Sequence, residues 1–439
     1  MFVLFGVAFL VKPVEGSCSG VSPNLTAPTW ADVAACHRTA SNGDTIAVSG
    51  GSYTVTTTTS ITKYVNIVAS GTVTLTDNTP NTSDLIVIAE STLGSTRLQG
   101  FTFVQGNAVH GNPNGVIRLT TTTRGLPILI AGNSYKTLMS SGDFIIAQVN
   151  RGVIWNNLMT GFPSSSNCFD NNSFVRHKLT GVTSSWTTPS TFGSEDSNGN
   201  LNLYIETNTL VNVAEGIDTD DNARTVVRYN TITNSGMILH GVDTSGTQGA
   251  RYVEYYNNTF IRDMSLVCQG GTLPVNQNGF IGVRGGTALI HDNVIPDIND
   301  GYWGNKSEIT FAVEELRRNA GGYPCWNTTT QRGAGYPAPK QSGWGYITGS
   351  VQPGRTGVRQ DLEPIYLWNN TGGGNYNSPV LAEYGPNECG TSADTVANYI
   401  QQNREYYLST PKPGYKPYTY PHPLTASTQS STSGAPAIK

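Results

Sequence analysis

The stretch "TVVRYNTITN", residues 225–234, carries the pattern that predicts the fold. The β-forming residues Val226 and Val227 are followed by two variable positions and then by Asn230. An apolar residue, Ile232, stands two positions after the asparagine. Branched residues in short alternating runs are typical of β-strands that bury one face. The stretch therefore predicts two short strands on either side of an asparagine turn.

The same pattern recurs along the chain at changing intervals. Successive copies centre on seven asparagines: Asn133, Asn157, Asn208, Asn230, Asn258, Asn293 and Asn370. The steps between the copies at 208, 230, 258 and 293 are 22, 28 and 35 residues. A constant motif at variable spacing predicts stacked coils whose loops differ in length, which is a parallel β-helix. The sequence leaves open how many coils lie between residues 160 and 208.

Two positions of the repeat are apolar in almost every copy. Three residues before the asparagine stand Ile130, Ile154, Ile205, Val227, Tyr255 and Ile290. Two residues after it stand Tyr135, Met159, Leu210, Ile232, Phe260 and Ile295. We expect both columns to point into the core. We expect each asparagine to occupy a turn with unusual backbone angles, and its amide to bond from coil to coil.

The N-terminal part agrees with this architecture. The segment "TWADVAACHRTA", residues 29–40, predicts a short amphipathic helix that caps the open end of the solenoid. The segment "NGDTIAVSGGSYTV", residues 42–55, then begins the first coil. A helix followed by G-D-T-I-x-V and G-x-Y resembles the start of the pectate-lyase-like superfamily. That resemblance implies an all-β fold, a right-handed parallel β-helix, over about residues 29–300 and 362–372. It implies no single activity, because the superfamily includes lyases, hydrolases, esterases, tailspikes and adhesins.

The remaining segments complete the expected organisation. We predict a signal peptide over residues 1–16, a cap over 17–43, coils over 44–300, an insertion over 301–361, a last coil with a C-terminal extension over 362–422, and a disordered tail over 423–439. The C-terminal extension resembles the ending of uncharacterised secreted bacterial β-helix proteins. In the insertion, "SEITFAVEELRRNA" (residues 307–320) predicts a short helix. Trp303 and Trp326 could stack on sugar rings there, or could simply pin the loop.

Several features predict export to the cell surface or the medium. The apolar run from Phe2 to Val11 is too short to cross a bilayer and fits a secretory signal. No other segment predicts a membrane span. The six cysteines favour disulfides in an exported chain, and we expect Cys18 to pair with Cys36. A net charge of -4 gives no general attraction to nucleic acid. The oligomeric state stays open.

The stretch "DTDDNAR", residues 218–224, is the candidate site. Asp218 lies ten residues after one repeat asparagine, and His240 lies ten residues after the next. Neighbouring strands are about 4.8 Å apart, so the two side chains could touch. Asp218 and Asp220 would share one strand face, while Asp221 would face the other way. His110, His177 and His291 lack such neighbours, and we expect them to be structural or surface residues.

Two kinds of catalysis fit this site. Crowded carboxylates such as Asp218, Asp220 and Asp221, beside His240, could cleave a glycosidic bond by acid–base chemistry. The order D-x-D-D followed one coil later by H-G is loosely similar to polygalacturonase-type glycosidases, although their preceding asparagine–aspartate element and following R-x-K step have no counterpart here.

A lyase would instead neutralise a uronate carboxylate and remove the C5 proton. Arg224, Arg251 and Arg284 could bind that carboxylate. No cofactor is required, but Ca²⁺ could be held by the three aspartates of the candidate site.

The sequence thus predicts a secreted carbohydrate-active protein whose partner is a polysaccharide or other glycan. The first hypothesis is a polysaccharide lyase or glycoside hydrolase with its site on the outer face of the β-helix. The alternative is a non-catalytic solenoid, such as an adhesin, a glycan-binding protein or a structural protein. In that case the aspartates would simply accept backbone hydrogen bonds in turns.

Overall fold

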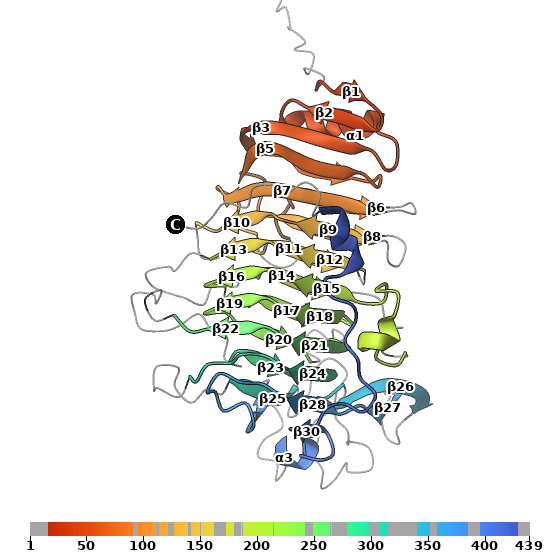
Figure 1. Cartoon of the computed structure of the whole chain (residues 1–439), viewed down its shortest axis with the longest axis vertical. Coiled ribbons are helices and arrows are strands. Elements are labelled where there is room, and N and C mark those ends of the chain that lie inside the picture. The colour runs from red at the N-terminus through yellow and green to blue at the C-terminus, as the bar shows by residue number, and fades with distance from the viewer. Residues whose placement is uncertain are drawn as a thin grey trace, which may run out of the picture.

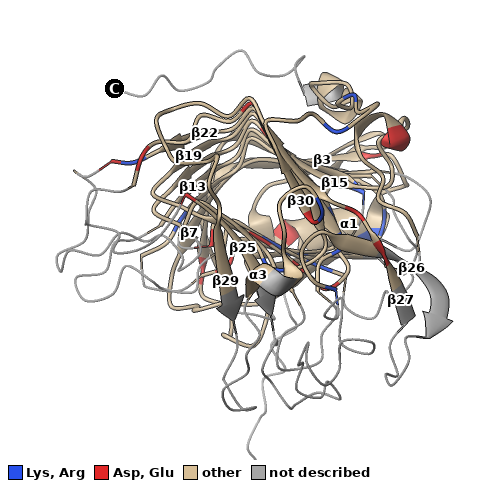
Figure 2. Cartoon of the chain, turned by 90° about the horizontal axis from the view of Figure 1, so that it is seen from below, with Lys and Arg blue, Asp and Glu red and all other residues tan. Residues whose placement is uncertain are grey.

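The computed structural model describes residues 16–90, 95–110, 114–121, 127–138, 142–149, 151–161, 173–179, 186, 188–213, 215–241, 249–263, 265, 279–298, 308–314, 340–351, 358–384 and 396–428. The described strands stack along the long axis of the molecule as parallel ladders (Figure 1), which confirms the parallel β-helix. Figure 2 looks along the stack and shows successive coils lying over one another. None of the described helices is long and apolar enough to cross a membrane.

Three faces form the solenoid wall. The first face contains β9 (Ile128–Ala131), β12 (Gly152–Trp155), β15 (Leu203–Glu206), β18 (Arg224–Arg228), β21 (Tyr252–Tyr256), β24 (Thr287–His291), β28 (Ile365–Trp368) and β30 (Tyr406–Leu408). The second face contains β10 (Ser134–Lys136), β13 (Leu158–Thr160), β16 (Thr209–Val211), β19 (Thr231–Thr233) and β22 (Thr259–Ile261). Three long strands, β3 (Thr45–Val55), β5 (Asn66–Asp77) and β7 (Thr96–Gln105), run through both faces and join them.

Within the described residues, the third face is a parallel sheet of ten strands. Its strands are β4 (Thr59–Ile61), β6 (Ile86–Glu90), β8 (Ile117–Thr121), β11 (Ile145–Gln148), β14 (Val175–Lys178), β17 (Ile217–Asp220), β20 (Met237–Leu239), β23 (Ile281–Val283), β25 (Ile309–Glu314) and β29 (Val380–Tyr384). On the first face, β12 pairs directly with β15, so these two strands belong to neighbouring coils. The interval between residues 160 and 208, for which the sequence left the number of coils open, therefore belongs to a single coil step, with β14 as its described third-face strand.

The core lies inside the three faces. Both apolar columns of the repeat point inward and are buried, as predicted. Aromatic rings continue the packing near the N-terminal end, where Phe144 stacks on Tyr135 with ring centroids 5.0 Å apart. The expected cap is present as a 3-10 turn (Trp30–Asp32) and α1 (Val33–Thr39). The predicted Cys18–Cys36 disulfide joins this cap to β1 (Ser19–Val21) and β2 (Asn24–Ala27), with 5.0 Å between the Cα atoms.

The repeat asparagines form a continuous ladder of hydrogen bonds. The side-chain oxygen of Asn230 accepts from the backbone N–H of Asn208 (2.9 Å) and from its amide (3.0 Å). The amide of Asn230 donates to the side-chain oxygen of Asn258 at 2.9 Å. The same contacts link the seven copies from Asn133 to Asn370. These buried amides therefore satisfy turn groups that could not reach water.

The predicted backbone strain lies one residue earlier than expected. The positive φ angles belong to the residue before each repeat asparagine: Gly132, Asn156, Thr207, Tyr229, Asn257, Asp292 and Asn369. The repeat asparagine itself does not have a positive φ. The left-handed residue makes the corner, and the amide that follows ties the corner to the next coil.

Two local predictions are wrong. The segment predicted as a helix over 307–320 forms strand β25 in its described part, because Ile309 and Phe311 alternate along a sheet that buries them, with β23 and β29 as neighbouring strands. The predicted disordered tail begins too early, because residues 423–428 form a 3-10 helix (Pro423–Thr428) in which Thr425 is buried. The insertion also holds an antiparallel hairpin of β26 (Trp344–Val351) and β27 (Val358–Leu362). Trp303 and Trp326 lie outside the described residues.

Residues 409–428, here called the C-terminal strap, run back over the outer surface of the first face (Figure 1). Helix α3 (Val396–Tyr399) precedes the strap, and a 3-10 turn (Gly193–Asp196) lies against it. The carbonyl of Tyr418 accepts from Arg228 at 2.7 Å. His422 donates its backbone N–H to Glu206 at 2.8 Å. The strap thus buries the Arg228–Glu206 ion pair, which a bare outer ladder would leave in solvent.

The asparagine ladder leads to a stability prediction. We expect Asn230→Ala to lower the free energy of unfolding by roughly 2–4 kcal/mol, because it leaves buried polar groups of both neighbouring coils without partners. Chemical denaturation followed by circular dichroism measures this loss. Asn198→Ala, at an exposed loop position, is the control and should change stability by less than about 0.5 kcal/mol. Equal effects of the two variants would contradict the structural role of the ladder.

The strap leads to a pH prediction. Burial raises the pKa of Glu254 to about 7, although the Tyr415 hydroxyl and the Gly193 N–H both donate to this carboxyl and oppose the shift. Because the folded protein holds this proton more tightly than the unfolded chain, stability should fall as the pH rises from about 4.5 through 7. We expect Glu254→Gln to flatten that part of the curve of melting temperature against pH. An unchanged curve would contradict the assignment.

Candidate functional site

The candidate site lies on the outer side of the third face. In β17, Ile217 and Thr219 point inward, so Asp218 and Asp220 share the outer side, as the alternation predicted. Strand β14 lies on one side of β17, where Arg176 pairs with Asp218 in register. The carboxylates are therefore held between strands rather than in a loop.

Asp218 is the centre of this network. Its side chain is fully buried, and its Oδ2 accepts from the guanidinium of Arg176. Its Oδ1 lies 3.1 Å from Nε2 of His240. The predicted contact between Asp218 and His240 therefore exists, but the register differs. Strand β20 places Ile238 beside Asp218, and His240 reaches back from two residues further along.

Further ion pairs extend the network. Arg176 also contacts Asp143 at 3.1 Å and Glu215 at 3.4 Å. Lys178, on the same side of β14, lies 2.5 Å from Asp220. The other oxygen of Asp220 accepts the backbone N–H of Asp221 at 2.7 Å, in the turn that leads to the first face. We name Asp143, Arg176, Lys178, Glu215, Asp218, Asp220 and His240 the third-face cluster.

Burial and charge act in opposite directions on the ionisable groups of the cluster. Burial alone would raise the pKa of Asp218, but His240 and Arg176 hold it well below its ordinary value. Burial would lower the pKa of His240, but Asp218 outweighs it and raises that pKa to about 9. Burial raises the pKa of Asp143 to about 6, although Arg176 partly offsets the shift. Asp218 is thus ionised at neutral pH.

Exposure differs sharply within the cluster. The carboxylates of Asp218 and Asp220 are 0% and 2% exposed. Solvent reaches the edges of Lys178 (15%), His240 (16%) and Glu215 (20%). Any ligand from solution would therefore meet the imidazole, the ammonium and Glu215 before the buried aspartates.

Sequence analysis missed Asp143, Arg176, Lys178 and Glu215. The sequence did contain a signal for the Arg176–Asp143 pair. In two coils, an arginine at the second position of a third-face strand contacts an aspartate of the preceding coil. Arg118 contacts Asp84 at 2.7 Å in this way, and Arg176 contacts Asp143. The pattern was hidden because the loops between these coils differ in length and obscure the third-face register.

The three predicted substrate-binding arginines do not lie together. Arg224 begins β18 on the first face and donates to the carbonyls of Pro189 and Thr188. Arg251 is fully buried and pairs with Glu363 at 2.6 Å. Arg284 follows β23 on the third face, and its positive charge acts on His240. Of the three arginines, Arg284 is thus the one that the structure relates to the cluster.

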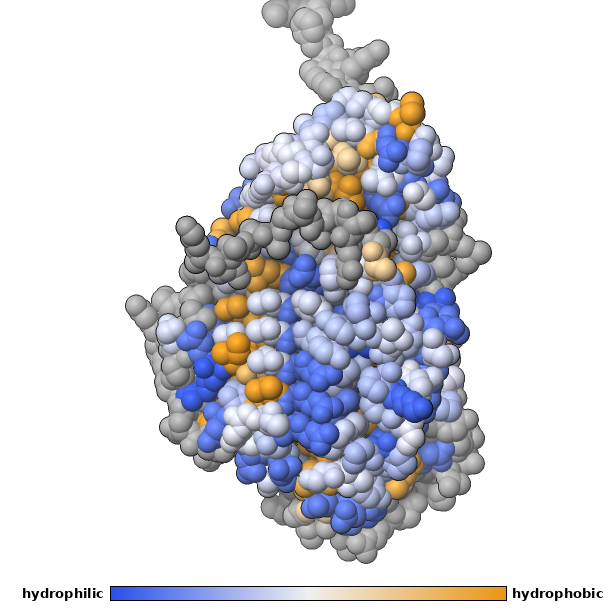
Figure 3. Space-filling model, in the orientation of Figure 1, coloured by the Kyte–Doolittle hydropathy of each residue, from blue (hydrophilic) through white to orange (hydrophobic). Residues whose placement is uncertain are grey.

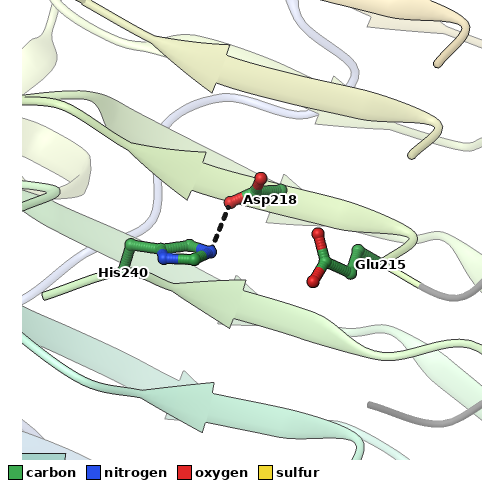
Figure 4. A group of neighbouring side chains, drawn as sticks. All are labelled: Glu215, Asp218 and His240. Atoms are coloured by element: carbon green, nitrogen blue, oxygen red, sulfur yellow. Dashed lines mark ion pairs between the residues drawn. The ribbon is translucent and has the colours of Figure 1, made fainter. Parts of the chain in front are cut away.

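A second grouping matters for metal binding. Among the described residues, Glu215, Asp218 and His240 bring one ligand atom each to within 4.8 Å of the others (Figure 4). This set shares only Asp218 with the three aspartates predicted to hold Ca²⁺. Asp220 is occupied by Lys178 and by the Asp221 N–H, and Asp221 has a φ of 39° in the following turn. The Ca²⁺ site stays a prediction.

The three remaining histidines of the sequence prediction are all buried. His177 bonds Thr225 and the carbonyl of Val149, and burial lowers its pKa to about 3. His291 stacks between Tyr256 and Trp368. His110 contacts Asp77 at 2.7 Å. These contacts agree with structural roles.

The outer side of the second face has a different character. Figure 3 shows regular columns of near-neutral and hydrophobic residues over β13, β16, β19 and β22. In β16, β19 and β22 the outward positions are Thr209, Val211, Thr231, Thr233, Thr259 and Ile261. Those three strands thus present no charged side chain outward, in contrast to the third face.

Comparison with known proteins gives a limited result. No protein-family model matches the chain, and no curated protein matches it. Among solved structures, the chain is similar to a mutant of AlyGC, an alginate lyase of the PL6 family, with 12% sequence identity and a TM-score of 0.32. The match covers 88% of this chain and 53% of that structure, so the chain spans about half of its length.

The cluster leads to a stability prediction. We expect Asp218→Asn to destabilise the fold by about 3–5 kcal/mol, because it leaves Arg176 without one of its buried partners. Thermal and denaturant unfolding measure the loss. Arg176→Met with Asp218→Asn together should cost less than the sum of the two single changes. Strictly additive effects would show that the two side chains do not interact.

Proposed function

We propose that this chain is a secreted carbohydrate-active enzyme that cleaves an acidic polysaccharide by β-elimination on the outer side of the third face. The supporting observation is the contrast in exposure within the third-face cluster. The side chains of Lys178 and His240 are 15% and 16% exposed, with the ring nitrogens of His240 buried just beneath the surface, whereas Asp218 and Asp220 are covered. Positive groups at the surface suit a substrate that carries carboxylates.

The buried aspartates fit hydrolysis less well. A glycoside hydrolase uses two carboxyl groups that face one sugar ring, one of them protonated. In this cluster Asp218 is ionised and held by Arg176, and Asp220 is held by Lys178. Neither carboxylate faces solvent, so elimination is the better match among the two enzymatic hypotheses.

In a β-elimination the substrate carboxylate is neutralised, the C5 proton is removed, and the bond from C4 to the glycosidic oxygen breaks. A C4=C5 double bond forms, and the leaving oxygen takes up a proton. The described residues account for the first of these steps. Lys178 lies at the exposed edge, and the charges of His240 and Arg284 add to its charge from beneath the surface. Such preorganised positive groups stabilise the carbanion-like transition state.

The non-catalytic alternative has support of its own. The charged groups of the cluster satisfy one another, as they would in a structural ladder. The two hypotheses differ in their products. An enzyme releases oligosaccharides with unsaturated ends, while a binding or structural solenoid releases none.

The test is a digest of uronate-containing and neutral polysaccharides by the purified full chain. We expect new reducing ends together with the ultraviolet absorbance of unsaturated products, on acidic substrates only. Arg284→Gln and His240→Gln should each lower kcat/KM by ~10²–10³-fold. Glu195→Gln, at an exposed position away from the cluster, is the control.

Three outcomes would count against the proposal. Reducing ends without ultraviolet absorbance would mean hydrolysis. No product on any substrate would favour the non-catalytic solenoid. Full activity in the two cluster variants would remove the third-face cluster as the site.

A further inference from the structure

We propose that Glu215, Asp218 and His240 bind one divalent transition-metal ion, with Mn²⁺ or Zn²⁺ preferred over Ca²⁺. The three side chains come from the end of one third-face strand and the start of another, and they point into one space (Figure 4). Their ligand atoms lie within 4.8 Å of one another. The binding itself is independent of the proposed function; the role of the ion in catalysis rests on it.

The geometry between Asp218 and His240 fits two ligands of one ion. Oδ1 of Asp218 and Nε2 of His240 are buried atoms that form an ion pair at 3.1 Å without the alignment of a hydrogen bond, and neither has a hydrogen-bond partner elsewhere among the described residues. Two ligand atoms that each lie about 2.0–2.2 Å from a metal are themselves roughly 3 Å apart. The pair therefore has the separation of neighbouring ligands without the alignment of a hydrogen bond.

Arg176 supplies the outer layer that such sites require. Its guanidinium holds Oδ2 of Asp218 and lies 3.4 Å from Oε2 of Glu215, while Asp143 holds the guanidinium from the far side at 3.1 Å. A group that bonds the second oxygen of a ligating carboxylate fixes the direction of the first. Asp218 is therefore oriented toward His240 before any ion binds.

The net charge of the third-face cluster favours the binding of a divalent cation. The cluster contains four carboxylates, Asp143, Glu215, Asp218 and Asp220, against two permanent cations, Arg176 and Lys178, which leaves two negative charges (4 − 2 = 2). Arg284 stands near His240 and offsets one of these charges. Once the ion displaces the proton of His240, it enters a site that keeps one net negative charge (4 − 3 = 1).

The ligand set decides the class of metal. Ca²⁺ prefers six to eight oxygen ligands, whereas one imidazole with two carboxylates suits transition ions. The ligand atoms of Asp218 and His240 are buried, whereas the Glu215 side chain is 20% exposed, so solvent would reach the ion from the side of Glu215. In the proposed enzyme this ion, held by His240 in place of its proton, would take over from the protonated imidazole the neutralisation of the substrate carboxylate, together with Lys178.

The test is metal binding by the full chain after treatment with EDTA. Equilibrium dialysis against MnCl₂, ZnCl₂ or CaCl₂, with elemental analysis of the protein, gives the stoichiometry and the affinity. We expect one Mn²⁺ or Zn²⁺ per chain and weaker binding of Ca²⁺. Electron paramagnetic resonance of the Mn²⁺ complex should show coupling to one imidazole nitrogen.

The variants avoid the buried Asp218, whose loss would affect folding. We expect His240→Gln and Glu215→Gln each to weaken binding at least ~10–100-fold, and His240→Gln to abolish the nitrogen coupling. Glu195→Gln should bind like the original chain. Absence of a bound ion, unchanged binding in His240→Gln, or tighter binding of Ca²⁺ would each overturn the inference.

The result can be separated from the test of the proposed function. Elimination that persists in EDTA, in a chain that binds no ion, would remove the metal and keep the enzyme. Stoichiometric binding with nitrogen coupling, in a chain that cleaves no polysaccharide, would keep the metal site and remove the enzyme.

Discussion

The hydrogen-bonded ladder of asparagines is the interaction on which the rest of the structure depends. Each coil must turn a corner, and a corner exposes backbone groups that have no strand partner. Here a left-handed residue makes the corner, and the next asparagine bonds the coils on both sides. Since seven copies stack in one column, the corner sets the height and the register of every coil between Asn133 and Asn370.

Register then decides which side chains meet on the outer surface. Strands of the third face stand about 4.8 Å apart, so outward side chains of adjacent coils are close neighbours. Arg176 and Asp218 are paired in this way, and His240 reaches the same carboxylate from the next coil. The cluster thus results from the stacking of coils, because charged residues from separate coils form ion pairs with one another. The burial of Asp218 strengthens each of its contacts.

The C-terminal strap divides the surface into closed and open parts. It covers the charged and aromatic column on the first face, where Arg228, Glu206 and Glu254 receive partners from residues 415–422. Uncharged residues line the outer side of β16, β19 and β22 on the second face. The third face keeps charged groups with solvent-exposed edges, which is why both proposals concern that face.

The sequence by itself determined the coil, because its signals are local. The repeat asparagine, the two apolar columns, the N-terminal helix and the Cys18–Cys36 pair are all readable within short segments, and the structure contains each of them. The contact of Asp218 with His240 was predicted from their distance to the repeat, although the strands pair in a register two residues away from the predicted one. The contact of Arg176 with Asp143 could not be predicted, since loops of unequal length hide the third-face register from the sequence. Strand β25 and the strap were decided only by tertiary structure, because burial against distant coils outweighs local preference.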